Sequence, residues 1–322
     1  MKKSIIALLL AAVCLFTAAC GNETPEPTAE TPETAEPVPT ETTEPPVPEI
    51  SWMKLPADRQ ITAKQYFVYD CETGEFLVRA ESEDTKIYPA SVTKLFTAYV
   101  ALQYLKPGQL ITAGDALDRV VPGSSVAEIK KGDQVSVEAL VEGMLLPSGN
   151  DAAWLLAEAA GRMLMGKNGS KATPTEAVIR FVSEMNAQAK LLGMTGTNFD
   201  NPDGIHSENH YTTYRDLAIM ATAALEEPVI LRYAKVSKDQ VTLASGTVNW
   251  KNTNELINPE SPYYCEACLG LKTGQTPKAG SCLVSAFEFD GKTYVIGVFG
   301  CPEIDDRFPD TLQLLNQVLG IS

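Results

Sequence analysis

The chain has only two histidines among its 322 residues, His206 and His210, and this scarcity narrows its chemistry. A Ser-His-Asp hydrolase needs a histidine within reach of its serine. Neither histidine accompanies a nucleophile elbow such as Gly-x-Ser-x-Gly, so we interpret both as structural. A structural zinc site needs four ligands. We therefore expect no metal centre and no cofactor.

Cysteine is also sparse, and residues 51–322 contain an odd number of cysteines, so they cannot all be paired within one chain. The Cys265-Glu-Ala-Cys268 spacing allows a vicinal-type disulfide, a redox pair or half of a metal site. Because four metal ligands are hard to assemble here, we expect a local disulfide or free thiols. The five cysteines of this region are Cys71, Cys265, Cys268, Cys282 and Cys301.

Positive charge is scarce as well. The chain has 26 Lys and Arg against 41 Asp and Glu, a net charge of −15. Without the two lysines near the start and the eight glutamates of residues 21–50, residues 51–322 keep a net charge of −9. A moderately acidic domain is not expected to bind nucleic acid or an anionic surface.

The apolar run of residues 4–19 is shorter than the about 20 residues of a membrane-spanning helix. It follows Met1-Lys2-Lys3 and ends in Thr17-Ala18-Ala19-Cys20-Gly21, so residues 1–20 are interpreted as an export signal. Small residues before a cysteine resemble the lipobox of bacterial lipoproteins, although Thr17 stands where leucine is usual. We expect lipidation at Cys20, with ordinary signal cleavage or an uncleaved anchor as alternatives.

Residues 21–50 contain no lysine or arginine but eight prolines, eight glutamates and seven threonines. Such a segment buries too little apolar surface to fold, and its prolines extend it by about 3.1 Å per residue. We interpret it as a disordered linker. It would act as a stalk that holds the exported domain, residues 51–322, at the outer face of the cytoplasmic membrane.

Residues 51–322 are enough for one large domain. Their pattern predicts an α/β (α+β) domain whose single sheet is assembled from both ends of the chain, with a helical subdomain at about 106–225 beside it. The active site would lie in the cleft between the two parts. The predicted strands are 65–70, 75–80, 269–276, 281–289 and 292–299, and the main predicted helices are 91–105, 136–146, 213–225, 310–319, one from about 150 and one from about 174.

One stretch, Tyr88-Pro89-Ala90-Ser91-Val92-Thr93-Lys94, places a serine in the first turn of a predicted helix and a lysine three residues later. Residues i and i+3 share a helix face, so Ser91 and Lys94 can touch. An unprotonated amine can take the proton of a serine hydroxyl and make it a nucleophile. Alone, the pattern also fits a capping serine followed by a surface lysine.

Two further motifs strengthen this hypothesis. Ser148-Gly149-Asn150 lies between two predicted helices, and Lys272-Thr273-Gly274 lies on a predicted strand. Ser-x-x-Lys, Ser-x-Asn and Lys-Thr-Gly in this order are the signature of penicillin-binding proteins and serine β-lactamases. With residues 199–204, 210–213 and 272–280, the chain resembles the low-molecular-weight D-alanyl-D-alanine carboxypeptidases over about residues 60–320. The resemblance implies the β-lactamase/transpeptidase-like fold, a five-stranded antiparallel sheet flanked by helices with a helical subdomain.

The resemblance also implies a reaction and its residues. Ser91 would attack the bond between the two terminal D-alanines of a peptidoglycan stem peptide and form an acyl-enzyme, and β-lactams would be covalent inhibitors. Lys94 would be the base, kept neutral by burial and by the nearby cation of Lys272. Ser148 would relay a proton to the leaving amine. Asn150 would orient Lys94 and bind the substrate amide.

By the same resemblance, the backbone N–H groups of Ser91 and Gln275 form the oxyanion hole. Histidine is common in the family at the position of Gln275, a departure that affects only side-chain specificity. We expect the substrate carboxylate to be bound by Lys272, Thr273, Gly274 and Arg307. The alternative for Arg307 is a surface residue beside Asp305 and Asp306.

Two other functions remain open. A β-lactamase with a separate glutamate base carries Glu-x-x-Leu-Asn before the third motif, and Glu255-Leu256-Ile257-Asn258 does not match it. A non-catalytic wall-binding or sensor module would not need Lys94. Low-level transpeptidation is compatible with the same site. Many family members continue into a C-terminal β-rich domain and anchor, and here we expect the N-terminal lipid to serve as the anchor.

Overall fold

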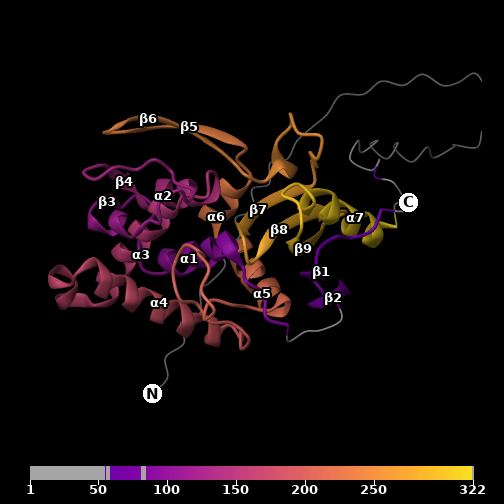
Figure 1. Cartoon of the computed structure of the whole chain (residues 1–322), viewed down its shortest axis with the longest axis horizontal. Coiled ribbons are helices and arrows are strands. Elements are labelled where there is room, and N and C mark those ends of the chain that lie inside the picture. Colours follow the sequence, from indigo (N-terminus) through magenta and orange to yellow (C-terminus); the bar gives the residue numbers. More distant parts are fainter. Residues whose placement is uncertain (1–54, 56–58, 81–84, 321–322) are drawn as a thin grey trace, which may run out of the picture. The chain divides into compact units, whose positions relative to one another are not determined.

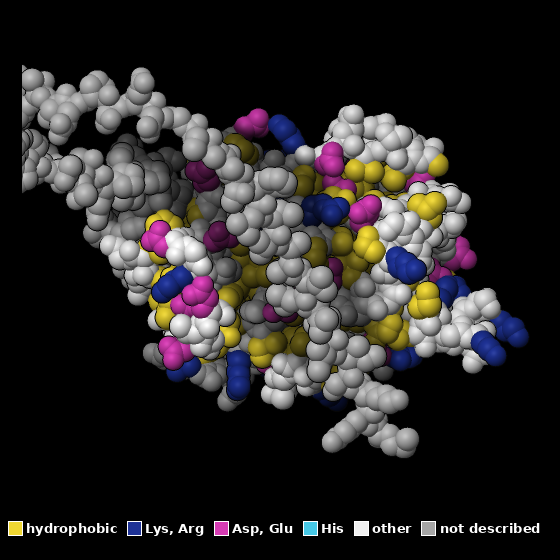
Figure 2. Space-filling model, turned by 180° about the vertical axis from the view of Figure 1, so that it is seen from behind, with side chains coloured by type: hydrophobic (Ala, Val, Ile, Leu, Met, Phe, Trp, Pro, Cys, Tyr) yellow, Lys and Arg dark blue, Asp and Glu magenta, His cyan; other side chains and the backbone are white. Residues whose placement is uncertain are grey.

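The computed structural model describes residues 55, 59–80 and 85–320. The predictions for the export signal, for lipidation at Cys20 and for the linker of residues 21–50 lie outside the described residues. Within the described part, no helix is long and apolar enough to cross a membrane. Basic and acidic side chains are interspersed on the face shown in Figure 2.

A five-stranded antiparallel sheet joins the two ends of the described chain, as the sequence predicts (Figure 1). Its strand order is β2-β1-β9-β8-β7, so the N-terminal hairpin pairs with the last strand. Asp290 and Gly291 both have positive φ, which is the geometry of a tight hairpin turn between β8 and β9. The strands are β1 (Gln65–Asp70), β2 (Glu75–Arg79), β7 (Cys268–Thr276), β8 (Gly280–Phe289) and β9 (Lys292–Cys301).

The strands β7, β8 and β9 are buried on both faces, which explains their almost continuous apolar runs, whereas the edge strand β2 is exposed at alternate residues. In β8, Leu283 and Phe287 join the cluster under α7, whereas Val284 and Ala286 join the larger cluster on the other face. This alternation is the period of two expected of a strand. Helices α1 (Thr93–Leu102), α5 (Tyr214–Leu225) and α6 (Pro228–Ala234) belong to the larger cluster, and α7 (Arg307–Leu319) covers the opposite face.

The predicted helical region contains α2 (Val137–Leu145), α3 (Asn150–Leu164) and α4 (Pro174–Leu191). Two of these helices begin at predicted caps, since the Ser136 hydroxyl accepts from a backbone N–H of α2 and Thr173 forms a capping box in α4. The apolar stripe of α4 is buried, as expected of core residues. Helix α5 instead packs on β1 and β9, so it belongs with the sheet.

Several elements differ from the prediction. Ser91 lies in a short 3₁₀ turn (Ala90–Val92), and α1 follows it and ends at Leu102, earlier than expected. Helix α7 starts at Arg307. The structure adds α6 and two antiparallel strand pairs, β3 (Leu110–Thr112) with β4 (Gln134–Ser136) and β5 (Lys238–Leu243) with β6 (Gly246–Lys251). These segments are short, and β5 and β6 are mostly exposed, so they lack a strong apolar pattern.

The five cysteines of the described chain are free thiols, and four of them are buried. Of the open alternatives, the structure therefore shows free thiols and no local disulfide between Cys265 and Cys268. Burial raises the pKa of the Cys268 thiol to about 12, so this thiol stays protonated and unreactive at neutral pH.

Candidate active site

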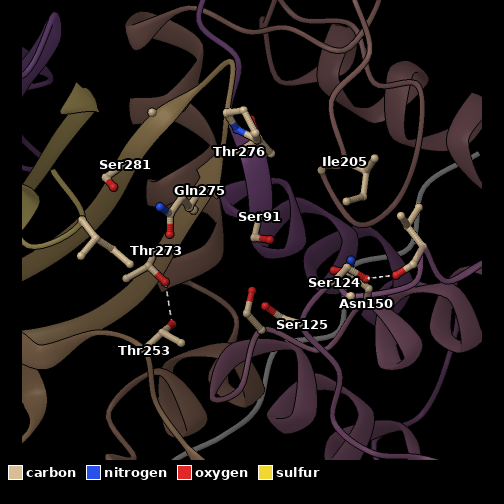
Figure 3. A pocket seen from close by; sticks show the side chains of 18 of the residues that line it. Ser91, Ser124, Ser125, Asn150, Ile205, Thr253, Thr273, Gln275, Thr276 and Ser281 are labelled. Carbon is tan, nitrogen blue, oxygen red and sulfur yellow. Dashed lines mark hydrogen bonds between the residues drawn. The ribbon is translucent and has the colours of Figure 1, made fainter. Parts of the chain in front are cut away.

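The predicted contact between Ser91 and Lys94 is present. The Lys94 amine lies 2.8 Å from the Ser91 hydroxyl oxygen and donates a second hydrogen bond, of 2.6 Å, to the backbone carbonyl of Asp203. Lys94 is completely buried, whereas Ser91 is partly exposed in a cleft (Figure 3). The nucleophile candidate thus faces solvent, and its amine partner lies in the protein interior.

The loop of residues 199–205 supports the Ser91–Lys94 pair from the protein interior. The Trp154 indole N–H donates to the Asp203 carboxylate at 2.8 Å, and the Gly204 N–H donates to the Asn201 side chain at 2.7 Å. Gly204 has φ +84°, and a Cβ built on it would lie 1.9 Å from the Ala90 carbonyl oxygen. Only glycine allows the loop to approach the nucleophile turn so closely.

The Ser-x-Asn motif forms the opposite wall of the cleft. Ser148 is buried with φ +64°, a strained conformation for a residue with a side chain, and such strain is concentrated at functional sites. Asn150 begins α3, and its backbone N–H donates to the Ser125 carbonyl. The buried Asp151 carboxylate accepts from Ala127 and Ile129 N–H groups, which fastens the loop of residues 121–129 to α3.

The Lys-Thr-Gly motif lies on β7, an edge strand beside the Ser91 turn. A Cβ built on Gly274 would lie 3.1 Å from the Ser91 nitrogen, so the strand backbone runs directly along the nucleophile. Lys272 is buried and donates to the Thr273 carbonyl at 3.0 Å. The hydroxyls of Thr273 and Thr253 are 2.5 Å apart (Figure 3).

Arg307 is buried, not a surface arginine. Its Nη1 donates to the Gly274 carbonyl at 3.4 Å, and its Nε is buried without a hydrogen-bond partner. Arg307 is also the first residue of α7, where the positive end of the helix dipole disfavours a cation, and burial lowers its pKa. A buried cation with a free donor at the cleft is suited to an anionic ligand.

Burial is the main cause of the lowered pKa of both lysines. It lowers the pKa of Lys94 to about 8, against smaller opposing effects of Asp203 and Asp151. It also lowers the pKa of Lys272, which falls further because of the positive charges of Lys94 and Arg307. The effect of Lys94 on Lys272 places the two amines near each other, and mutual repulsion disfavours protonation of both at once. The role of Lys272 as the cation that keeps Lys94 neutral stays a prediction.

A cleft of about 680 Å³ brings the predicted residues together. This volume is within the usual range for small-ligand sites. Lys94 and Lys272 lie buried beneath its surface. The predicted residues that line the cleft are Ser91, Ser148, Asn150, Thr273, Gly274, Gln275 and Arg307.

The contacts of Asn150 and His210 bear on the roles predicted for them. Asn150 makes no hydrogen bond to Lys94, whose partner besides Ser91 is the Asp203 carbonyl. His210 is buried, which lowers its pKa to about 4, and its Nε2 lies 2.8 Å from the Thr93 hydroxyl. This neutral histidine supports the turn after Ser91, as a structural residue would. The contributions of Asp203 and Thr253 were not singled out from the sequence.

The architecture and the three motifs around one cleft define a protein of the penicillin-binding fold. The family model for D-alanyl-D-alanine carboxypeptidase matches residues 52–302. The chain therefore belongs to the D-alanyl-D-alanine carboxypeptidase family.

Individual relatives agree with this assignment. The D-alanyl-D-alanine carboxypeptidase of Streptomyces sp. strain K15 is 33% identical over 73% of this chain and 80% of its own length. The D-alanyl-D-alanine carboxypeptidase of Bacillus subtilis is 28% identical over 79% of this chain, which spans only 61% of that relative. A crystal structure of the Streptomyces K15 DD-transpeptidase superposes with a TM-score of 0.73 at 31% identity, covering 81% of this chain and 98% of that one.

Proposed function

We propose that this protein is a serine-type D-Ala-D-Ala carboxypeptidase that removes the terminal D-alanine from peptidoglycan stem pentapeptides. The observation that carries the proposal is the 2.8 Å contact of the Ser91 hydroxyl with the buried Lys94 amine. Family membership supports the same reaction.

The residues suggest the following steps. Neutral Lys94 takes the hydroxyl proton of Ser91 as the oxygen attacks the carbonyl of the penultimate D-alanine. The N–H groups of Ser91 and Gln275 stabilise the oxyanion, and one such donor contributes about 2.7–4 kcal/mol to lowering the barrier. Ser148 passes a proton to the leaving amine, which departs as D-alanine. Water then hydrolyses the acyl-enzyme, restoring the serine and releasing the shortened peptide.

Recognition of a free C-terminus is supported by the charge of the cleft. Among the described residues, Arg307 is the only charged side chain that lines it. The Thr273 hydroxyl lies in the same cleft, and Lys272 lies beneath it. A terminal carboxylate bound to these groups would place the last peptide bond at Ser91, which favours a carboxypeptidase over an enzyme that cleaves within a chain.

The acyl-enzyme can also pass to an amine, and the structural similarity to the Streptomyces K15 DD-transpeptidase supports transpeptidation as a second activity. β-Lactams are proposed as covalent inhibitors through the same serine. We further propose that residues 1–20 direct export and that a lipid on Cys20, with the linker of residues 21–50, tethers the domain of residues 51–322 to the outer face of the cytoplasmic membrane.

The proposal predicts that the purified protein releases D-alanine from a pentapeptide ending in D-Ala-D-Ala and that Ser91→Ala abolishes the release. Mass spectrometry of the shortened peptide measures the reaction. A folded wild-type protein that acylates with benzylpenicillin but releases no D-alanine would indicate a sensor. Rapid turnover of the penicilloyl adduct would indicate a β-lactamase.

A further inference from the structure

A second group of polar side chains lies just outside the cleft. Ile205 and Pro277 line the cleft, and His206 and Lys278 are the next residues of the same two segments. Glu208 contacts His206, and its carboxylate is near enough to Lys278 for their charges to interact. We call Tyr88, His206, Glu208 and Lys278 the rim cluster.

The carboxylate of Glu208 is held in a fixed position but remains accessible. The Tyr88 hydroxyl donates to its Oε2 at 2.7 Å, and the His206 Nε2 lies 3.4 Å from its Oε1. The rings of Tyr88 and His206 pack edge to face at 4.6 Å. The Tyr88 hydrogen bond holds the pKa of Glu208 below its usual value, while 74% of the side chain is exposed. The rim cluster therefore presents an ordered negative charge to solvent.

Lys278 adds a positive charge next to this carboxylate. Lys278 is exposed and close enough to Glu208 to lower its pKa, yet the two side chains do not form an ion pair within 4.0 Å. Both charges are thus available to a ligand. A group that carries an ammonium and a carboxylate on one carbon complements such a pair.

The position of the rim cluster relative to Ser91 defines which part of a substrate reaches it. A carboxylate held at Arg307 and Thr273 directs the acyl part of the peptide to the other side of Ser91, where Figure 3 shows Thr276 and Ile205. Tyr88 is three residues from Ser91, and Lys278 is three residues from Gln275. At no more than about 3.3–3.6 Å per residue, each lies within roughly 11 Å of its neighbour in the cleft.

We propose that the rim cluster selects the third residue of the stem peptide and favours a side chain that ends in an amino-acid zwitterion, as diaminopimelate does. Glu208 binds its ammonium and Lys278 its carboxylate. A lysine side chain satisfies Glu208 alone and is repelled by Lys278. This inference rests on the proposed function, since it concerns the substrate of the same cleft.

The test compares kcat/KM for D-alanine release from three pentapeptides whose third residue is meso-diaminopimelate, L-lysine or Nε-acetyl-lysine. The diaminopimelate peptide should react roughly three- to fivefold faster for each charge engaged, the size expected of exposed ion pairs. The preference should shrink at about 1 M salt, where such pairs are screened. Equal rates for the three peptides would overturn the proposal.

Variants separate the two charges. Glu208→Gln keeps an oxygen for the Tyr88 hydroxyl and should slow the diaminopimelate and lysine peptides but not the acetylated one. Lys278→Gln should slow only the diaminopimelate peptide and speed the lysine peptide. Lys238→Gln and Glu260→Gln, at an exposed 3.4 Å ion pair outside the cleft lining, are matched controls.

Benzylpenicillin has no counterpart of the third residue of the stem peptide. It therefore separates a failure of the rim-cluster proposal from a failure of the proposed function. The rate of acylation by benzylpenicillin should be unchanged in Glu208→Gln and Lys278→Gln. Equal slowing of penicillin and all three peptides would mean that Glu208 only braces the loop, and the proposal would be wrong. A wild-type protein that neither acylates nor releases D-alanine would contradict the proposed function itself.

Discussion

Replacement of Lys94 by methionine is expected to lower the rate of Ser91 acylation about 100- to 10,000-fold, the usual contribution of a general base. The methionine keeps the length of the buried stem but removes the amine that lies 2.8 Å from the Ser91 hydroxyl. Because Lys94 is completely buried, a positive charge on its amine destabilises the folded protein, and the change removes that unfavourable charge. We therefore expect the melting temperature to stay equal or rise while activity is lost.

The rate of Ser91 acylation is expected to rise with pH, and this rise should depend on Lys94. Lys94 acts as a base only when neutral, and its pKa is about 8. About one tenth of the protein is then competent at pH 7 and about nine tenths at pH 9, so wild-type acylation should rise about tenfold between them. Lys94→Met should lose this rise. Lys106→Met, at an exposed lysine just beyond α1, is the control. An unchanged rate and pH profile in Lys94→Met would contradict the role of this amine.

Gly204→Ala is expected to damage both stability and activity, although Gly204 contributes no side chain. The new Cβ would lie 1.9 Å from the Ala90 carbonyl oxygen, so either the loop or the nucleophile turn must move. Backbone strain of about 1–2 kcal/mol and overpacking of about 1–3 kcal/mol predict a loss of roughly 2–5 kcal/mol in the free energy of unfolding. A displacement of about 1 Å at Ser91 can lower the acylation rate about 100-fold.

Gly193→Ala is the matched control for this prediction. Gly193 has φ +85°, almost the same as Gly204, but a Cβ built on it meets nothing within 4 Å. It should therefore lose only the strain of about 1–2 kcal/mol and retain full acylation. Urea unfolding and benzylpenicillin acylation measure the two effects. Equal losses in the two variants would show that backbone strain alone matters and that the loop does not brace the Ser91 turn.

The sequence predicts the nucleophile pair because helical spacing alone brings Ser91 and Lys94 together. It does so even though Ser91 lies in a 3₁₀ turn and not in α1 itself, since a tight turn also places residue i near i+3. The sheet is predictable for a similar reason. Its strands β8 and β9 are buried on both faces, so their apolar runs are long and distinct.

Other parts of the site leave no pattern in the sequence. The partner of Lys94 is the backbone carbonyl of Asp203, and any residue has such a carbonyl. Thr253 follows a polar, exposed hairpin that has no apolar periodicity, yet its hydroxyl reaches Thr273. Arg307 lies next to two aspartates and would be taken for a surface residue without the family resemblance. Its burial depends on tertiary packing at the start of α7.

The most direct test of a Ser91 acyl-enzyme is the mass of the intact protein after incubation with benzylpenicillin, followed by mapping of the modified peptide. We predict one penicilloyl group per chain, located on the peptide that contains Ser91, and none on a folded Ser91→Ala variant. An adduct that persists in Ser91→Ala, or a folded wild-type protein that forms no adduct, would contradict this mechanism.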